Sequence, residues 1–175
     1  MTVTVFGSHV PLSVWTLAVL VVGTLVSVLL ARQLARRTNW SFRATLVTLL
    51  LFTAALAVTL TPGAEQHRNG VLACLPDDFT DLTREILHSG GGVAGDLLNL
   101  VLLLPLAGAI VVTTRRVLPG VALALLLPLV IEAAQTQLAG RYCSLSDLVA
   151  NISGALLGVA FGSFVLRRVG DRGGW

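Results

Sequence analysis

The sequence contains no lysine and few charged residues of any kind. Only 12% of its 175 residues are charged, whereas 55% are hydrophobic and the mean hydropathy is +0.86. A soluble domain carries about twice that charged fraction. The composition therefore excludes an ordinary soluble domain and is typical of an integral membrane protein. It also excludes a nucleic-acid-binding face, which needs a basic patch on a soluble surface.

Other absences narrow the class further. The apolar residues do not alternate along the chain, which argues against a transmembrane β-barrel. There is no internal repeat, linker or low-complexity segment, so residues 1–175 are predicted to form one domain. No basic residue precedes the first apolar run, and Arg32, Arg36 and Arg37 follow it. This run is therefore predicted to be a retained anchor and not a cleaved signal peptide.

Five apolar runs are present, and most approach the roughly 20 residues that a helix needs to cross a bilayer. The sequence therefore predicts an all-α fold, a polytopic membrane helix bundle with five transmembrane helices. The predicted helices cover residues 12–31, 42–60, 95–113, 117–138 and 147–166.

The positions of the arginines predict the orientation. Most of them lie between the first and second runs, between the third and fourth runs, or after the fifth run. Only Arg68, Arg84 and Arg141 fall on the other side. Because basic loops stay in the cytoplasm, the N-terminus is predicted to lie outside and the C-terminus inside.

The segment at 61–95 is the longest one between apolar runs and is predicted to lie outside. Within it, "DDFTDLTREILHSGGG" offers Asp78 as an N-cap and Ser89 with Gly90 as a stop. A short amphipathic helix on the outer side is expected, with a mobile loop as the alternative. Cys74 and Cys143 both fall outside, where disulfides form. A Cys74–Cys143 bridge is predicted, and two unpaired cysteines are the alternative.

Polar residues interrupt the last three apolar runs at about one depth. Within each run they are spaced three or four residues apart, which places them on one helix face. An ionisable group in a spanning helix costs about 2.5–3.5 kcal/mol, so these groups are expected to face a shared pocket, with Glu132 paired to Arg141. The alternative is that they only hold the helices together, at about 0.6 kcal/mol per hydrogen bond. The predicted ligand-binding residues are Asp96, Asn99, Glu132, Gln135, Arg141, Ser144, Asp147 and Asn151.

Prolines and glycines in the same helices bear on how they pack. Gly154, Gly158 and Gly162 are four residues apart, a spacing that lets helices approach closely. Pro105 and Pro128 are expected to bend the third and fourth helices. The bends either open a cavity on the outer side or serve packing alone.

Two stretches resemble the VanZ-like family of bacterial membrane proteins. They are "EAAQTQLAGRYCSLSDLVANISGALLG" and "DLLNLVLLLPLAG", and the resemblance covers about residues 96–162. It implies a protein of the bacterial cell membrane and cell envelope. The founding member of that family is associated with low-level resistance to teicoplanin, a lipoglycopeptide that binds cell-wall precursors. The matching positions are Asp96, Asn99, Pro105, Gly108, Glu132, Gln135, Arg141, Ser144, Asp147, Asn151, Gly154 and Gly158.

The preferred function is that of a binding or accessory protein without a cofactor. Its outer pocket would bind the polar head of a membrane lipid, a lipid-linked cell-wall precursor or a lipoglycopeptide. Amides and carboxylates suit sugar hydroxyls and peptide donors, and Arg141 suits a phosphate.

Two other functions stay open. An intramembrane enzyme acting on a lipid would use Glu132 as general base, Arg141 to stabilise an anion and Asp147 to orient it. The sequence, however, has no Cys–His pair, no serine motif with a base nearby and no lysine. A lipid transporter or scramblase is disfavoured by the odd helix count and the missing inverted repeat, although a homodimer would restore symmetry.

No metal site is predicted. The three histidines are scattered along the chain, which gives zinc little support. A divalent cation held by Asp96, Glu132 and Asp147 is the alternative, because such cations prefer oxygen ligands.

Overall fold

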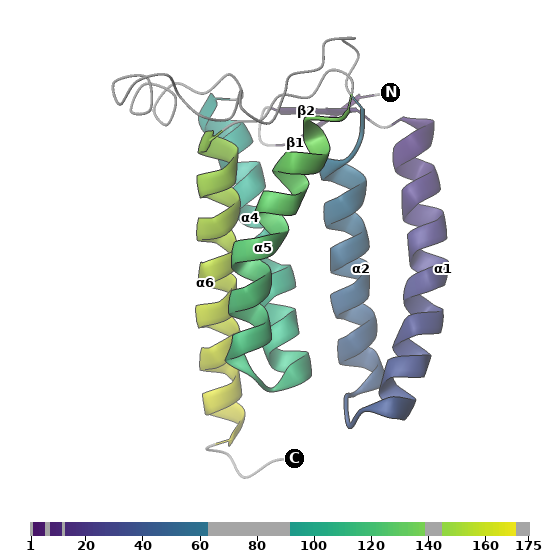
Figure 1. Cartoon of the computed structure of the whole chain (residues 1–175), viewed down its shortest axis with the longest axis vertical. Helices are drawn as coiled ribbons and strands as arrows, with labels where there is room; N and C mark the ends of the chain where they lie inside the picture. The colour runs from purple at the N-terminus through teal and green to yellow at the C-terminus, as the bar shows by residue number, and fades with distance from the viewer. Residues whose placement is uncertain (1, 6–7, 12, 63–91, 139–144, 171–175) are drawn as a thin grey trace.

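The computed structural model is a bundle of long helices with a small β-hairpin at one end (Figure 1). It describes residues 2–5, 8–11, 13–62, 92–138 and 145–170. Five helices are long and apolar enough to cross a membrane. The protein is therefore a multi-pass membrane protein, and the predicted all-α bundle of five spanning helices is confirmed.

The helix bounds agree with the predicted ranges to within a few residues, with two main exceptions. The first and last helices continue past their apolar runs into arginines, which form helices well and interact favourably with a helix C-terminus. The helices are α1 (Val14–Arg37), α2 (Phe42–Thr59), α4 (Gly92–Thr114), α5 (Val117–Gln135) and α6 (Leu145–Gly170).

The β-hairpin that precedes α1 was not predicted from the sequence. Strand β1 (Thr2–Val5) pairs antiparallel with β2 (Ser8–Pro11), and Val3 lies opposite Val10. The signal was present, because "TVTV" alternates with the period of a strand and a glycine stands between the two strands in the sequence. The predicted amphipathic helix at 78–90 and the Cys74–Cys143 pair lie outside the described residues.

The α4 and α6 helices form the most extensive helix contact and run in the same direction (Figure 1). A Cβ atom added to Gly154 would collide with the Leu100 carbonyl, and one added to Gly158 would collide with the Leu104 carbonyl. Only glycine lets the two backbones come this close. The close approach predicted from the glycine spacing is therefore confirmed.

The α1 and α2 helices are joined by buried hydroxyl pairs. The Oγ1 atoms of Thr16 and Thr61 are 2.9 Å apart, and Ser27 Oγ lies 3.1 Å from Thr53 Oγ1. Gly23 lies directly against Thr53, so the two helices touch closely at that level. Within lipid, burial of apolar surface does not drive helices together, so hydrogen bonds of this kind help to hold them in contact.

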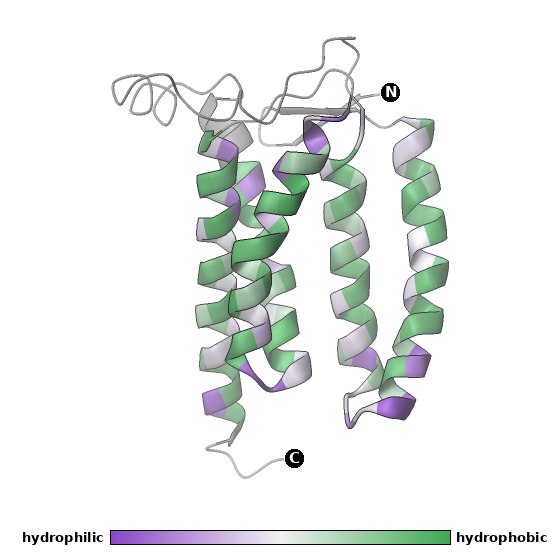
Figure 2. Ribbon diagram, viewed as in Figure 1, coloured by the Kyte–Doolittle hydropathy of each residue, from purple (hydrophilic) through white to green (hydrophobic). Residues whose placement is uncertain are grey.

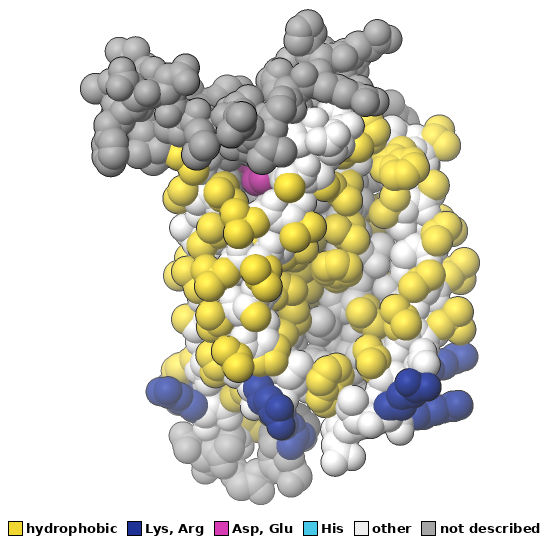
Figure 3. Space-filling model, in the orientation of Figure 1, with side chains coloured by type: hydrophobic (Ala, Val, Ile, Leu, Met, Phe, Trp, Pro, Cys, Tyr) yellow, Lys and Arg dark blue, Asp and Glu magenta, His cyan; other side chains and the backbone are white. Residues whose placement is uncertain are grey.

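The two ends of the bundle differ in charge. All eight arginines in the described part of the chain lie at one end, which we call the arginine end (Figure 3). The opposite end, which we call the polar end, carries Glu132 and Asp147. Between the ends the helices are mostly hydrophobic along their length (Figure 2). The eight arginines of the arginine end are Arg32, Arg36, Arg37, Arg43, Arg115, Arg116, Arg167 and Arg168.

Candidate functional site

The α5 helix buries both polar residues of its last turns. Glu132 is 4% exposed and Gln135 is 8% exposed, in a helix that is otherwise strongly apolar. Both follow Pro128, which is itself buried, and the helix continues through the proline. The two side chains are therefore held inside the protein and do not face lipid, as the cost of burying polar groups in lipid requires.

Gln135 reaches α2, a partner that the sequence analysis did not consider. Its Nε2 donates a hydrogen bond of 2.9 Å to the Thr59 carbonyl oxygen, at the last residue of α2. Carbonyls in the last turn of a helix have no partner within the helix, so the glutamine caps α2 from outside. Figure 1 shows α5 inclined so that its polar end approaches α2. A fourth helix, α2, thus contacts one of the predicted site residues.

The α6 helix places another amide deep in the protein. Asn151 is 2% exposed, and its Oδ1 accepts no hydrogen bond from any residue that the structure describes. A buried amide oxygen left open in this way is uncommon, because its desolvation is not repaid. Asp147, four residues earlier, is half-buried in the first turn of α6, where a negative charge is favoured.

The α4 helix brings its predicted residues to the same level as α6. The register of the glycine contact pairs Leu100 with Gly154. One turn toward the polar end, the same register sets Asp96 level with Ala150 and Asn151. Asp96 lies in the first turns of α4, but its side chain is outside the described part of the structure.

Not all of the predicted site residues are described by the structure. Arg141 and Ser144 lie in the segment between α5 and α6 that the structure does not describe, so the Glu132–Arg141 pair stays a prediction. Asn99 is half-buried on α4. No group of three histidine, cysteine or acidic side chains that could hold a metal occurs among the described residues. The cation alternative also needs Asp96, whose side chain is not described.

Small hydroxyls add to the polar character of this end. Thr59 and Thr136 are buried, and Ser146 at the start of α6 is 3% exposed. Thr59 donates to the Ala55 carbonyl oxygen, as threonines in helices often do. Single threonines and serines are common in spanning helices, so these residues were not predicted to belong to the site.

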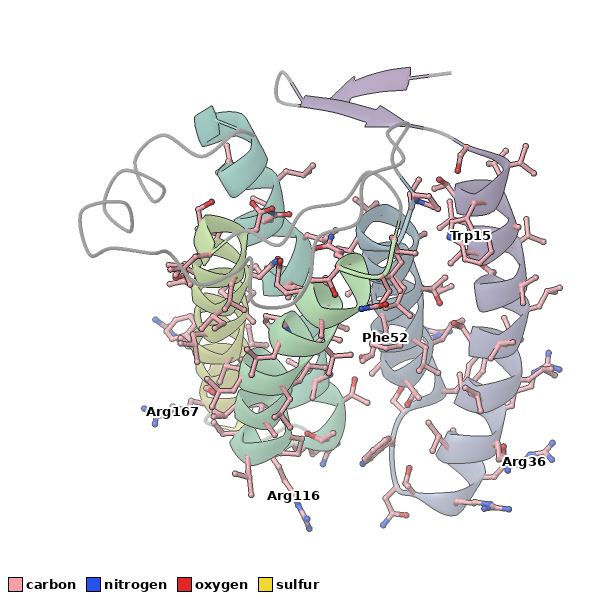
Figure 4. All side chains as sticks on the ribbon, turned by 45° about the horizontal axis from the view of Figure 1, so that its top comes forward. Trp15, Arg36, Phe52, Arg116 and Arg167 are labelled. Carbon is pink, nitrogen blue, oxygen red and sulfur yellow. The ribbon has the colours of Figure 1, made fainter. Side chains whose placement is uncertain are left out.

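The polar end therefore holds two buried amides and a buried carboxylate, carried by two helices, with an acceptor open on Asn151. Figure 4 shows oxygen and nitrogen atoms on the side chains that lie between the helices at this end. The arrangement holds hydrogen-bond donors and acceptors buried inside the protein, away from lipid.

Comparison with known proteins gives one positive finding. The model of the VanZ/LLP1 family matches residues 14–166, which include the first four spanning helices and most of the fifth. Searches against curated proteins and against solved structures give no match. The family match extends the resemblance seen in two motifs to nearly the whole chain. On this evidence the protein belongs to the VanZ/LLP1 family.

Proposed function

We propose that the protein binds the polar head of an envelope molecule in a site at the polar end of its bundle. Three classes of ligand fit: a lipid head group, a lipid-linked cell-wall precursor or a lipoglycopeptide such as teicoplanin. The site consists of Asp96, Asn99, Glu132, Gln135, Arg141, Ser144, Asp147 and Asn151.

One observation carries this proposal. Asn151 is 2% exposed, yet its Oδ1 has no donor among the described residues. A side chain that only tied helices together would use its acceptor on a neighbouring helix, as Gln135 uses its donor on Thr59. An open acceptor at the same end of the bundle as a buried carboxylate suits the hydroxyls and amide groups of sugars and peptides.

The proposed orientation places this site at the outer face of a bacterial membrane. Eight described arginines lie at the other end, and basic residues favour the cytoplasmic side. Cell-wall precursors and lipoglycopeptides meet the membrane from outside, so the site would lie where they are found.

Binding to purified protein tests the proposal. The protein in nanodiscs is titrated with teicoplanin and, separately, with a synthetic lipid-linked cell-wall precursor. Glu132→Gln keeps the volume and hydrogen-bonding capacity of the side chain but removes its charge, so it is expected to weaken binding at least about tenfold. Gln137→Ala is the matched control, because Gln137 is exposed two residues beyond Gln135.

Two results would overturn the proposal. One is that neither of these probes, nor a soluble short-chain phospholipid titrated in the same way, binds the wild-type protein. The other is that Glu132→Gln binds as well as wild type at equal abundance and thermal stability, which would make Glu132 a purely structural residue. Release of a product from the precursor probe would instead support the enzyme alternative.

A further inference from the structure

A separate cavity lies in the half of the bundle nearer the arginine end, between α2, α4 and α6. Its volume is about 490 Å³, within the range of about 300–1,000 Å³ that is usual for small-molecule sites. No residue of α5 and no described side chain of the proposed polar site lines it. The cavity is therefore distinct from the proposed polar site.

Small residues of closely packed helices line part of this cavity. Gly108 on α4 and Gly162 on α6 both line it, and a Cβ atom added to Gly162 would lie 2.7 Å from the Gly108 carbonyl oxygen. Ala44 and Ala109 are the other short side chains in the lining. Around them stand longer apolar side chains, among them Phe161, which is 62% exposed.

The chemistry of the lining selects an apolar occupant. Among the described residues that line it, the only polar side chains are Thr113 and Arg43. The Thr113 hydroxyl is 2.9 Å from the Thr48 hydroxyl, and Thr113 is only 6% exposed, so this hydroxyl is already hydrogen-bonded within the protein. Apart from Arg43, a polar solute would find few partners along the cavity, whereas a hydrocarbon chain would lose nothing by entering it.

Arg43 stands at the end of this cavity nearest the membrane surface. It is exposed at the start of α2, and the described carboxylates Glu132 and Asp147 lie at the opposite end of the bundle. Its guanidinium is therefore available for an anion, and guanidinium binds phosphate oxygens in a two-pronged geometry. The surrounding row of arginines attracts anionic lipids to this end.

We propose that the cavity holds one acyl chain of an anionic phospholipid, whose phosphate is bound by Arg43. The lipid comes from the leaflet at the arginine end. It fills the space between α2 and the closely packed pair of α4 and α6, so that α2 contacts these two helices partly through the lipid. The proposal does not depend on the polar site.

Native mass spectrometry of the detergent-purified full chain tests it. Phosphatidylglycerol or phosphatidylcholine is added and the affinity of the first bound lipid is measured. Wild type is expected to prefer phosphatidylglycerol. Arg43→Gln is expected to lower that affinity about tenfold, because a charge-assisted contact is lost. Arg167→Gln removes the same charge from an exposed position at the same end, outside the cavity lining, and is expected to change it less than about twofold.

A second variant fills the cavity. Ala109→Leu places a larger side chain in the lining and is expected to remove the first bound lipid, whereas Ala18→Leu on the exposed face of α1 is expected to retain it. If Arg43→Gln and Arg167→Gln lowered the lipid affinity equally, phosphatidylglycerol would be attracted only by the overall positive charge of the arginine end, and the proposal would be overturned. Retention of the lipid in a folded Ala109→Leu variant would also overturn the proposal. So would a wild-type protein that forms a dimer without bound lipid, because a second copy of the chain would then be the occupant of the cavity.

Discussion

At the scale of single residues, the two buried amides of the polar end are used differently. Gln135 donates to the last carbonyl of α2, while the Oδ1 of Asn151 is open within the described structure. The Gln135 hydrogen bond stabilises the bundle, whereas burying the Asn151 amide oxygen without a donor from a described residue lowers stability. Substitutions of the two residues should therefore separate packing from binding.

Gln135→Ala is expected to destabilise the protein by about 0.6 kcal/mol, and by no more than about 1.7 kcal/mol, the range for interhelical hydrogen bonds in membranes. The reason is the loss of the bond to the Thr59 carbonyl oxygen. Unfolding followed in detergent measures the change. Gln137→Ala is the control, and an equal loss of stability in both variants would contradict the role given to Gln135.

Asn151→Leu is expected to leave stability within about 1 kcal/mol of wild type, since no hydrogen bond from a described residue to Oδ1 is lost. It should nevertheless abolish binding of the teicoplanin or precursor probe. Thermal unfolding and the binding titration are measured on the same preparation. A stable variant that still binds would remove Asn151 from the site.

At the scale of elements, the contact between α4 and α6 depends on glycine. Gly154 and Gly158 face carbonyl oxygens of α4, which cannot move aside as a flexible side chain can. Gly108 is less constrained, because a Cβ atom there would stand 3.0 Å from the Gly158 carbonyl oxygen. The three positions form a graded series on one interface.

Gly154→Ala and Gly158→Ala are expected to destabilise the bundle by about 2–3 kcal/mol, the upper part of the range for overpacking. Gly108→Ala should cost less, at roughly 1 kcal/mol. Unfolding in a mixed detergent series ranks the three. If Gly108→Ala were the most damaging variant, the described closeness of the two backbones would be wrong.

The helices themselves could be predicted from the sequence because hydropathy and length suffice for spanning segments. The glycine contact could also be predicted, from the spacing of Gly154, Gly158 and Gly162. The link from Gln135 to α2 could not, because its acceptor is a backbone carbonyl that no residue type marks. The hydroxyl pair of Thr16 and Thr61 was missed for a related reason, since threonine is ordinary in apolar helices.

At the scale of the whole molecule, charge divides the bundle. The arginines at one end and the buried amides and carboxylate at the other give the protein a direction across the membrane. The proposed site has a function at the cell envelope only if the polar end is outside. Orientation is therefore the assumption on which the proposed function rests.

Single-cysteine variants test that orientation, with the native Cys74 and Cys143 replaced by serine. A cysteine at Arg37 or Arg115 is expected to react with an impermeant reagent only after the membrane is opened, whereas one at Arg68 should react in intact cells. The opposite labelling pattern would show that the polar end lies in the cytoplasm, which is the reverse of the predicted orientation.

The parallel contact of α4 with α6 also has a consequence for biosynthesis. The two helices are separated along the chain by α5, so α4 leaves the ribosome before its main partner exists. At about 5–20 residues per second, the interval is on the order of seconds. During that time the α4 backbone at Leu100 and Leu104, which the glycines of α6 later cover, faces lipid or another protein. A chain that stops before α6 lacks its largest helix contact and presents that uncovered face to membrane quality control.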